Sequence, residues 1–362
     1  MPRTVLHDVF DLGQSAWLDT ISRSLIASGG LAQWIEQGVV GVTTNPSIFE
    51  GAIAKTEDYD KEIAEMAGKG KTASDIYEAL TLQEVGAAAD IMRPVYDKTK
   101  GQDGYVSLEV NPLLASDLAS TVSEAKRLFS ILNRPNVMIK IPATPEGVAA
   151  VEQCIAAGVN VNATLIFSEE QYASVAEAYI KGLKARAAKG ESLAVASVAS
   201  VFVSRVDTAV DKALAAKSEN SLCGKIAVDG IRLTYQRFKK IFSGAEWEAL
   251  AAKGAKVQRP LWASTGTKNP AYSDVKYVQE LIGPDTVNTV PPSTLTAFLD
   301  HGKAKVAIED DLDGAKARMK RLDEVGVDLK AVCAKLLADG LESFNGAFKS
   351  LLAAIEKKAG KK

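Results

Sequence analysis

The chain alternates between short apolar runs and longer segments in which apolar residues recur every three or four positions. The short runs, rich in Val, Ile, Thr and aromatic residues, predict β-strands, and the longer segments predict amphipathic α-helices. Regular alternation of the two is typical of parallel sheets, and eight strands predict a closed α/β barrel of the (β/α)8 or TIM type. The predicted strands lie at Ala16–Asp19, Val39–Thr44, Tyr105–Val110, Val137–Ile141, Val159–Phe167, Leu193–Val203, Pro260–Ser264 and Thr286–Val290.

Two of the intervening helices have predictable first residues. Thr144 precedes Pro145, and this order predicts a helix with Thr144 as its N-cap and proline at the first helical position. Ser168 is followed three residues later by Gln171, which predicts a capping box. Both helices would start just after a predicted strand.

Two regions exceed a minimal barrel, and we expect both to belong to a single domain that spans residues 1–362. Residues 51–104 are long enough for two or three helices over the barrel mouth, one of them near Ala73–Val95. The segment from about 308 to 359 also has a helical pattern. One apolar face in this segment should dock onto the barrel, and it comprises Leu341, Phe344, Phe348, Leu351, Leu352 and Ile355.

Composition and charge exclude several classes of partner. A chain of 362 residues with 47% hydrophobic and 24% charged residues can bury a full core. A net charge of −2 and a pI near 5.9 argue against a nucleic acid, and no segment approaches the length of a membrane span. Three cysteines without paired spacing predict neither a disulfide framework nor a metal site, and they fit a reducing cytoplasm.

Lys140 is the residue that most strongly indicates chemistry. It interrupts the apolar run Val137–Ile141, where a strand core normally has no use for an ammonium group. Burial disfavours the charged form of lysine, so the amine must either be paired or become available as a nucleophile, and nucleophilic lysines form Schiff bases. The alternative is a lysine at a strand end whose amine reaches solvent.

Polar residues recur at the ends of the predicted strands. Active-site groups of a closed α/β barrel project from the carboxyl ends of several strands. The residues at these strand ends are Asp19, Thr43, Thr44, Asn45, Glu109, Asn111, Asn162, Thr164, Ser200, Arg205 and residues 264–268. Helix capping alone is a poor explanation for such a set of carboxylates, amides, hydroxyls and cations.

Four segments, taken in order, resemble the motifs of the transaldolase family. They are Thr43–Ile48, Val137–Thr144, Asn160–Ser168 and Ser200–Arg205. The resemblance covers nearly the whole chain, and Leu261–Pro270 together with the helical extension resembles the longer bacterial branch. It implies transfer of a dihydroxyacetone unit between sugar phosphates in the pentose phosphate pathway, without a metal or an organic cofactor. A monomer and a homodimer are both compatible with this sequence.

The resemblance also implies a role for each candidate residue. Lys140 would form the Schiff base with the ketose, and Asp19 would take the proton of the C4 hydroxyl. Glu109, helped by Thr164 through a positioned water, would carry protons while the imine forms. Residues that would bind the substrate comprise Asn45, Asn162 and Ser200 for the sugar, and Arg205, Lys268 and Ser264 for the phosphate.

The seventh predicted strand is followed by a departure from the family pattern. Shorter members have an arginine at the position aligned with Lys268, and the spacing around Ser264 differs. Lysine still offers phosphate a point charge. The departure affects how this loop aligns with that of other family members, and it does not change the expected activity.

Alternatives remain at the level of single residues and of function. Asp19 and Asn45 could each be the N-cap of a following helix. A lyase that cleaves fructose 6-phosphate, or a barrel that binds sugar phosphates without turnover, could share the fold. Small aldolases similar to transaldolase have a tyrosine where Glu109 stands and differ at Phe202, so these residues favour the transferase. A binding protein would not need Lys140, Asp19 and Glu109 together.

Overall fold

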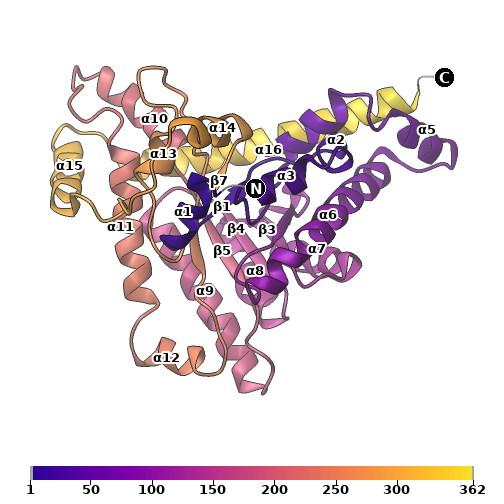
Figure 1. Cartoon of the computed structure of the whole chain (residues 1–362), viewed down its shortest axis with the longest axis horizontal. Coiled ribbons are helices and arrows are strands. Elements are labelled where there is room, and N and C mark those ends of the chain that lie inside the picture. Colours follow the sequence, from indigo (N-terminus) through magenta and orange to yellow (C-terminus); the bar gives the residue numbers. More distant parts are fainter. Residues whose placement is uncertain (1–2, 361–362) are drawn as a thin grey trace.

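Parallel strands form one curled sheet at the centre of the molecule (Figure 1). The structure is a computed structural model that describes residues 3–360, so both ends of the predicted single domain, residues 1–2 and 361–362, lie outside the described residues. Within that range the sheet has seven strands in the order β1-β7-β6-β5-β4-β3-β2. They are β1 (Gln14–Leu18), β2 (Val106–Glu109), β3 (Val137–Pro142), β4 (Val161–Ile166), β5 (Ser197–Phe202), β6 (Arg259–Ala263) and β7 (Thr286–Val290).

The gap between β1 and β2 is closed by an irregular segment. Val42 forms parallel bridges to Leu18 on one side and to Val106 on the other. Backbone amides extend the closure, since Thr43 N donates to Leu18 O and Ser107 N donates to Val42 O. The fold prediction of an α/β barrel with additional helices is therefore confirmed.

The prediction of a regular strand at Val39–Thr44 is wrong, because this segment makes only isolated bridges. Its backbone passes directly over the indole of Trp17 at Gly41, where an added Cβ would lie 2.5 Å from ring atoms. Gly38, just before the segment, has a φ of +108°. Because of this close approach and the turn before it, the segment forms a single β-bridge to each neighbouring strand rather than a continuous series of strand hydrogen bonds.

Helices surround the sheet and cap its carboxyl end. The α-helices are α1 (Val5–Asp11), α2 (Arg23–Ala27), α3 (Gly30–Glu36), α4 (Pro46–Phe49), α5 (Asp60–Gly68), α6 (Ala73–Lys98), α7 (Leu118–Leu132), α8 (Pro145–Ala156), α9 (Glu169–Ala188), α10 (Ser204–Ala215), α11 (Ile226–Ile241), α12 (Ala245–Ala251), α13 (Lys276–Gln279), α14 (Pro292–His301), α15 (Leu312–Glu324) and α16 (Leu329–Ala359). A π-helical turn covers Glu50–Ala54 and a 3-10 turn covers Pro112–Leu114.

The predicted caps at the starts of α8 and α9 form as hydrogen bonds. Thr144 Oγ1 accepts from Gly147 N, and Pro145 occupies the first turn of α8. Ser168 Oγ accepts from Gln171 N at α9, but Gln171 Oε1 accepts from the amide of Phe167 rather than from that of Ser168. The capping box predicted there is thus only half formed, because the side chain of Gln171 instead ties α9 to the end of β4.

The C-terminal helix α16 lies across the barrel and reaches the helices of the 51–104 region. It contacts α4, α5, α6 and α10 (Figure 1). The predicted apolar face is its docking face, because Phe344, Phe348, Leu351 and Ile355 are buried. The predicted helix near Ala73–Val95 is α6, which ends slightly later.

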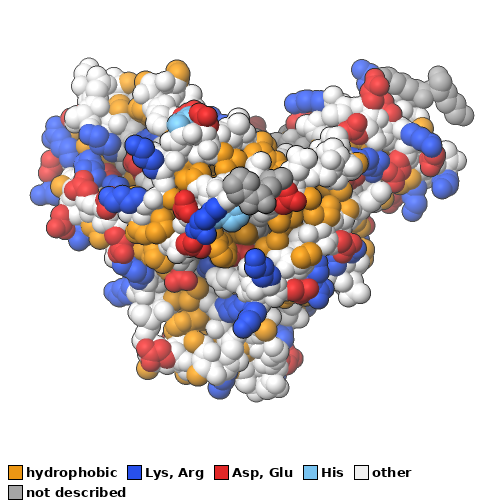
Figure 2. Space-filling model, viewed as in Figure 1, with side chains coloured by type: hydrophobic (Ala, Val, Ile, Leu, Met, Phe, Trp, Pro, Cys, Tyr) orange, Lys and Arg blue, Asp and Glu red, His pale blue; other side chains and the backbone are white. Residues whose placement is uncertain are grey.

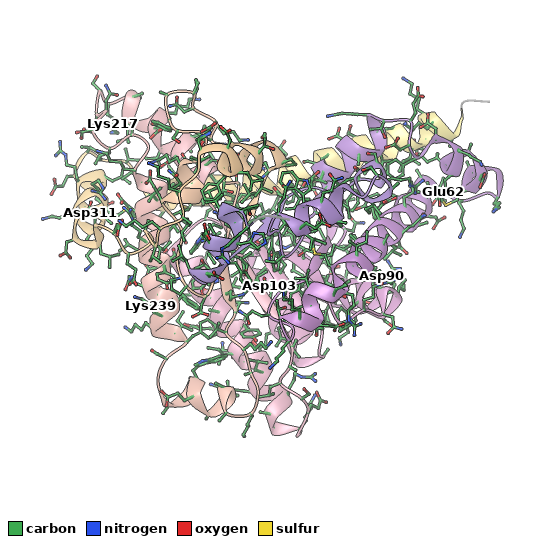
Figure 3. All side chains as sticks on the ribbon, viewed as in Figure 1. Glu62, Asp90, Asp103, Lys217, Lys239 and Asp311 are labelled. Atoms are coloured by element: carbon green, nitrogen blue, oxygen red, sulfur yellow. The ribbon has the colours of Figure 1, made fainter. Side chains whose placement is uncertain are left out.

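The opposite end of the barrel is closed by a buried ion pair. Asp103, labelled near the centre of Figure 3, lies 2.9 Å from Arg259 of β6. Its carboxylate also accepts from Ser15 Oγ at 2.9 Å and from Trp17 Nε1 at 3.0 Å. These bonds join the amino ends of β1 and β6 to the segment before β2, so the polar cavity described below opens at the other end.

The outer surface has mixed charge. On the face shown in Figure 2, Lys and Arg side chains alternate with Asp and Glu, and apolar side chains gather near the middle. This pattern agrees with a net charge of −2. Among residues 3–360, no helix combines the length and apolarity needed to cross a membrane.

Candidate active site

A polar cavity of about 190 Å³ opens at the carboxyl ends of the strands. Its lining combines seven of the ten predicted site residues, which are Asp19, Asn45, Lys140, Ser200, Arg205, Ser264 and Lys268. Thr43, Ser47, Phe202, Thr289 and Phe344 also line it. One carboxylate, Asp19, and three cations therefore converge on a space large enough for part of a small polar ligand.

Lys140 lies on β3 with its amine inside the barrel. The residue is 5% exposed, and Nζ donates to the backbone oxygen of Thr44 at 3.0 Å. Glu109 of β2 is its direct neighbour in the sheet register, and Oε2 of Glu109 lies 3.6 Å from Nζ. The ring of Phe344, from α16, has its centroid 5.8 Å from the same amine. The alternative of a lysine that reaches solvent from a strand end is wrong.

Glu109 is a buried carboxylate with few contacts. Burial raises its pKa from 4.5 to about 7, although the positive charge of Lys140 opposes the rise. Neither carboxylate oxygen has a hydrogen-bond partner among the described residues, and the same holds for the buried hydroxyl of Thr164. With a pKa near neutrality, Glu109 can both accept and donate a proton at physiological pH.

Asp19 follows β1 and faces the cavity. Its Oδ1 accepts from Thr43 Oγ1 at 2.8 Å. Burial raises the pKa of Asp19 above its usual value, and the charge of Lys140 and the Thr43 bond oppose this rise. The alternative that Asp19 is the N-cap of the following helix is wrong, because Ser22 caps α2 by accepting from Leu25 N.

The two asparagines lie at different depths. Asn45 lines the cavity while its Oδ1 accepts from Ile48 N, so the alternative of an N-cap is correct for this oxygen, which starts α4. Asn162 is fully buried one layer below. Its Nδ2 donates to Ser107 Oγ at 3.1 Å, and its Oδ1 accepts from Ser200 Oγ at 2.7 Å. Ser200, rather than Asn162, is the residue of this pair that lines the cavity.

Besides Lys140, two further cations, Arg205 and Lys268, line the cavity. Arg205 lies in the first turn of α10, with its guanidinium 5.2 Å from the centroid of the Phe202 ring. Burial lowers its pKa, an effect that Asp19 opposes. Between residues 3 and 360, Arg205 forms no hydrogen bond or ion pair with another side chain, so its planar donors are available to an anion. Lys268, on the loop after β6, is exposed.

Ser264 also lines the cavity. It has a φ of +57°, a left-handed conformation that costs a non-glycine residue free energy. Its hydroxyl lies 2.9 Å from that of Ser204, and its carbonyl accepts from Ser204 N. These bonds hold the end of β6 against the start of α10, so the strained residue is stabilised by the neighbouring helix.

Comparisons with known proteins agree with this geometry. The model of the family described as Transaldolase/Fructose-6-phosphate aldolase matches residues 16–355. A transaldolase of Trichodesmium erythraeum is 46% identical, with 98% of each chain covered. A transaldolase of Thiobacillus denitrificans is 47% identical over 97% of this chain and 99% of the relative, and one of Neisseria gonorrhoeae is 45% identical over the same shares. The chain belongs to the transaldolase/fructose-6-phosphate aldolase family.

Membership confirms the family predicted from the four motifs. The structure also shows site residues to which the sequence analysis assigned no role. Thr43 donates to Asp19 and in turn contacts the hydroxyl of Thr289, so these threonines orient a candidate catalytic carboxylate. Thr43 was among the polar residues found at strand ends, but no role was assigned to it. Thr289 lies next to the carboxyl end of β7, so the same rule could have found it, whereas Phe344 had no signal because it belongs to an apolar helix face.

Proposed function

We propose that this protein is a transaldolase, which moves a dihydroxyacetone unit from a ketose phosphate to an aldose phosphate through an imine on Lys140. The observation that carries the proposal is the buried amine of Lys140, which lies next to Glu109 and faces a cavity that Asp19 and Arg205 also line. Each of these groups matches one requirement of the reaction.

The reaction begins with attack of the Lys140 amine on C2 of the ketose. The resulting carbinolamine loses water and becomes a protonated imine. Asp19 then removes the proton of the C4 hydroxyl, the C3–C4 bond breaks, and its electron pair moves into the imine as the aldose phosphate leaves. The enamine that remains attacks the aldehyde of the acceptor, Asp19 returns the proton, and water hydrolyses the new imine.

Glu109 carries protons while the imine forms and breaks down. Its pKa of about 7 matches this double role, because both protonation states are populated near neutral pH. Buried polar atoms are normally hydrogen-bonded, and the carboxylate oxygens of Glu109 and the hydroxyl of Thr164 have no partner among the described residues. This supports a water molecule held between the two side chains. That water is the one released or consumed at C2.

The substrate is anchored at both ends. Asn45 and Ser200 contact the sugar hydroxyls, and Asn162 orients Ser200 through the hydrogen bond between them. Arg205, Lys268 and the Ser264 hydroxyl bind the phosphate, with arginine as the directional anchor. Because the protonated imine accepts the electron pair, this mechanism needs neither a metal ion nor an organic cofactor.

The second candidate is a fructose-6-phosphate aldolase, since the family includes both activities. An aldolase must release free dihydroxyacetone, whereas a transaldolase keeps it on the lysine until an acceptor arrives. Glu109 favours the transferase, because the resemblance assigns a tyrosine to the aldolases at this position. The same resemblance supports a role in the pentose phosphate pathway. The scattered cysteines support a cytoplasmic location, and a monomer and a homodimer are both compatible with the sequence.

One experiment tests both candidates. The protein is incubated with fructose 6-phosphate without an acceptor, glyceraldehyde 3-phosphate is quantified, and the enzyme is then reduced with borohydride and mapped by peptide mass spectrometry. A transaldolase releases about one equivalent per active site and retains a dihydroxyacetone adduct on Lys140. Continuous release identifies an aldolase.

The controls separate the imine from general lysine reactivity. Lys140→Ala should abolish both the release and the adduct. Lys276→Arg is the matched control, because Lys276 is also partly buried and paired, 2.6 Å from Glu280. Absence of an adduct on Lys140 in a folded wild-type protein would refute the proposed function.

A further inference from the structure

The loop that carries Lys268 is fastened to α10 by two tyrosine hydroxyls. Tyr272 Oη donates to Asp211 Oδ2 at 2.7 Å, and Tyr277 Oη donates to Asp207 Oδ2 at 2.7 Å. The two aspartates lie one turn apart on α10, and α13, which contains Tyr277, is close to α10 (Figure 1). The same helix therefore holds both tyrosines.

Each aspartate is itself held by a backbone amide. Asp211 Oδ1 accepts from Gly224 N at 2.9 Å, and Asp207 Oδ1 accepts from Ala227 N at 2.8 Å. The ring of Tyr272 also packs against Gly224, where an added Cβ would lie 2.6 Å from ring atoms. A ring packed this closely, with its hydroxyl bonded, has little freedom to move.

The fastened segment includes a wall of the candidate active site. Asp207, Asp211, Tyr272 and Tyr277 line a second cavity of about 170 Å³ together with Lys268. Lys268 also lines the active-site cavity, so it separates the two spaces. Within the loop, Tyr272 N donates to Asn269 O at 3.0 Å and Thr267 Oγ1 donates to Ser273 O at 2.8 Å, which makes the loop compact.

We propose that the pairs Asp211–Tyr272 and Asp207–Tyr277 are positioning residues that hold Lys268 at a set separation from Arg205. This inference rests on the proposed function, in which both cations bind the substrate phosphate. Arg205 is placed directly by α10, only two residues before Asp207. Lys268 is an exposed lysine with a flexible side chain, so its distance from the phosphate depends on where the loop lies.

The chemistry of the pairs fits such a role. A hydrogen bond from a tyrosine to a carboxylate is stronger than one between neutral groups. Tyr277 and Asp207 are both buried, which shields this bond from water. Since both carboxylates belong to the helix that carries Arg205, any small shift of α10 moves the two phosphate-binding cations together.

The first test is Tyr272→Phe, which removes only the hydroxyl. We expect the KM for fructose 6-phosphate and the inhibition constant of inorganic phosphate both to rise about fivefold to tenfold, with kcat within about twofold of the wild type. Borohydride trapping of unphosphorylated dihydroxyacetone on Lys140 should be unchanged, because that ligand lacks a phosphate. A merely structural defect would alter trapping as well.

Tyr235→Phe is the matched control, because its hydroxyl donates to Pro284 O at 3.1 Å and it lines neither cavity. Asp211→Ala should reproduce the effect of Tyr272→Phe. Asp211→Asn should restore part of the phosphate affinity, since its single amide oxygen can still accept from Tyr272 while the bond from Gly224 N is lost. This pair of variants also decides the question if Tyr272→Phe does not fold.

The outcomes separate this inference from the function on which it rests. If the wild type traps dihydroxyacetone on Lys140 but Tyr272→Phe and Asp211→Ala match Tyr235→Phe in KM and in phosphate inhibition, the positioning role is overturned and the function stands. If the wild type traps nothing on Lys140, the proposed function fails and this inference fails with it.

Discussion

Replacement of Glu109 by glutamine should stabilise the protein in a pH-dependent way. Burial raises the pKa of Glu109 from 4.5 to about 7, so the folded state disfavours the ionised carboxylate. The stability that protonated Glu109 contributes is fully present below pH 4.5 and is lost as the pH rises through 7. At about 1.4 kcal/mol per pKa unit, the complete loss is about 3 kcal/mol.

The measurement compares the free energy of unfolding of wild type and Glu109→Gln by urea denaturation at several values between pH 5 and pH 8. Relative to that of the wild type, the free energy of unfolding of the variant should rise by about 2–3 kcal/mol between pH 5 and pH 8, because glutamine carries no charge to bury. Transaldolase activity should fall at the same time, because glutamine cannot transfer a proton.

The control is Glu248→Gln, an exposed carboxylate on α12. The difference in the free energy of unfolding between this variant and the wild type should stay constant across the same pH range. If the stability difference of Glu109→Gln also stays constant, Glu109 ionises as an ordinary carboxylate. The argument from burial would then be wrong, and with it the double role of Glu109 as acid and base.

Further predictions concern the catalytic carboxylate Asp19, the phosphate anchor, the closed end of the barrel and metal dependence. Asp19→Asn should lower kcat by about 10²–10⁴ in a steady-state assay while borohydride still traps dihydroxyacetone, because imine formation does not need Asp19. Arg205→Lys should raise the KM for fructose 6-phosphate about tenfold with a smaller change in kcat, since lysine lacks the planar pair of donors. Asp103→Ala should cost about 3–5 kcal/mol in urea denaturation, because Arg259 stays buried without its partner. Dialysis against EDTA should leave the activity unchanged, and a loss restored by a divalent cation would contradict the imine mechanism.

Much of the barrel was predictable from local pattern. Seven of the eight predicted strands form, because runs of β-branched residues between helical segments have few other stable arrangements. The segment at Val39–Thr44 was mispredicted as a regular strand. Its irregularity depends on the contact between Gly41 and Trp17, two residues whose proximity no local pattern reports.

The candidate site was also only partly predictable from the sequence. Lys140 could be found because a lysine inside an apolar run is anomalous. Asp19 and Glu109 could be found because they are polar residues at the ends of predicted strands, and Arg205 because it also ends a family motif. Their burial and separations depend on strand register and on α16. The contact of Phe344 with Lys140 joins residues more than two hundred positions apart, and it arises only when the C-terminal helix docks.

Strand periodicity and motif spacing are local properties, so the amino-acid sequence alone specifies which chemical groups are present and in which order they leave the strands. Which of these groups face the cavity, and what their environment does to them, depends on the tertiary structure. It buried Glu109 and raised its pKa, placed Asn162 beneath Ser200, and fastened the Lys268 loop to α10. Burial, pairing and desolvation depend on contacts between distant segments, and these exist only in the folded chain.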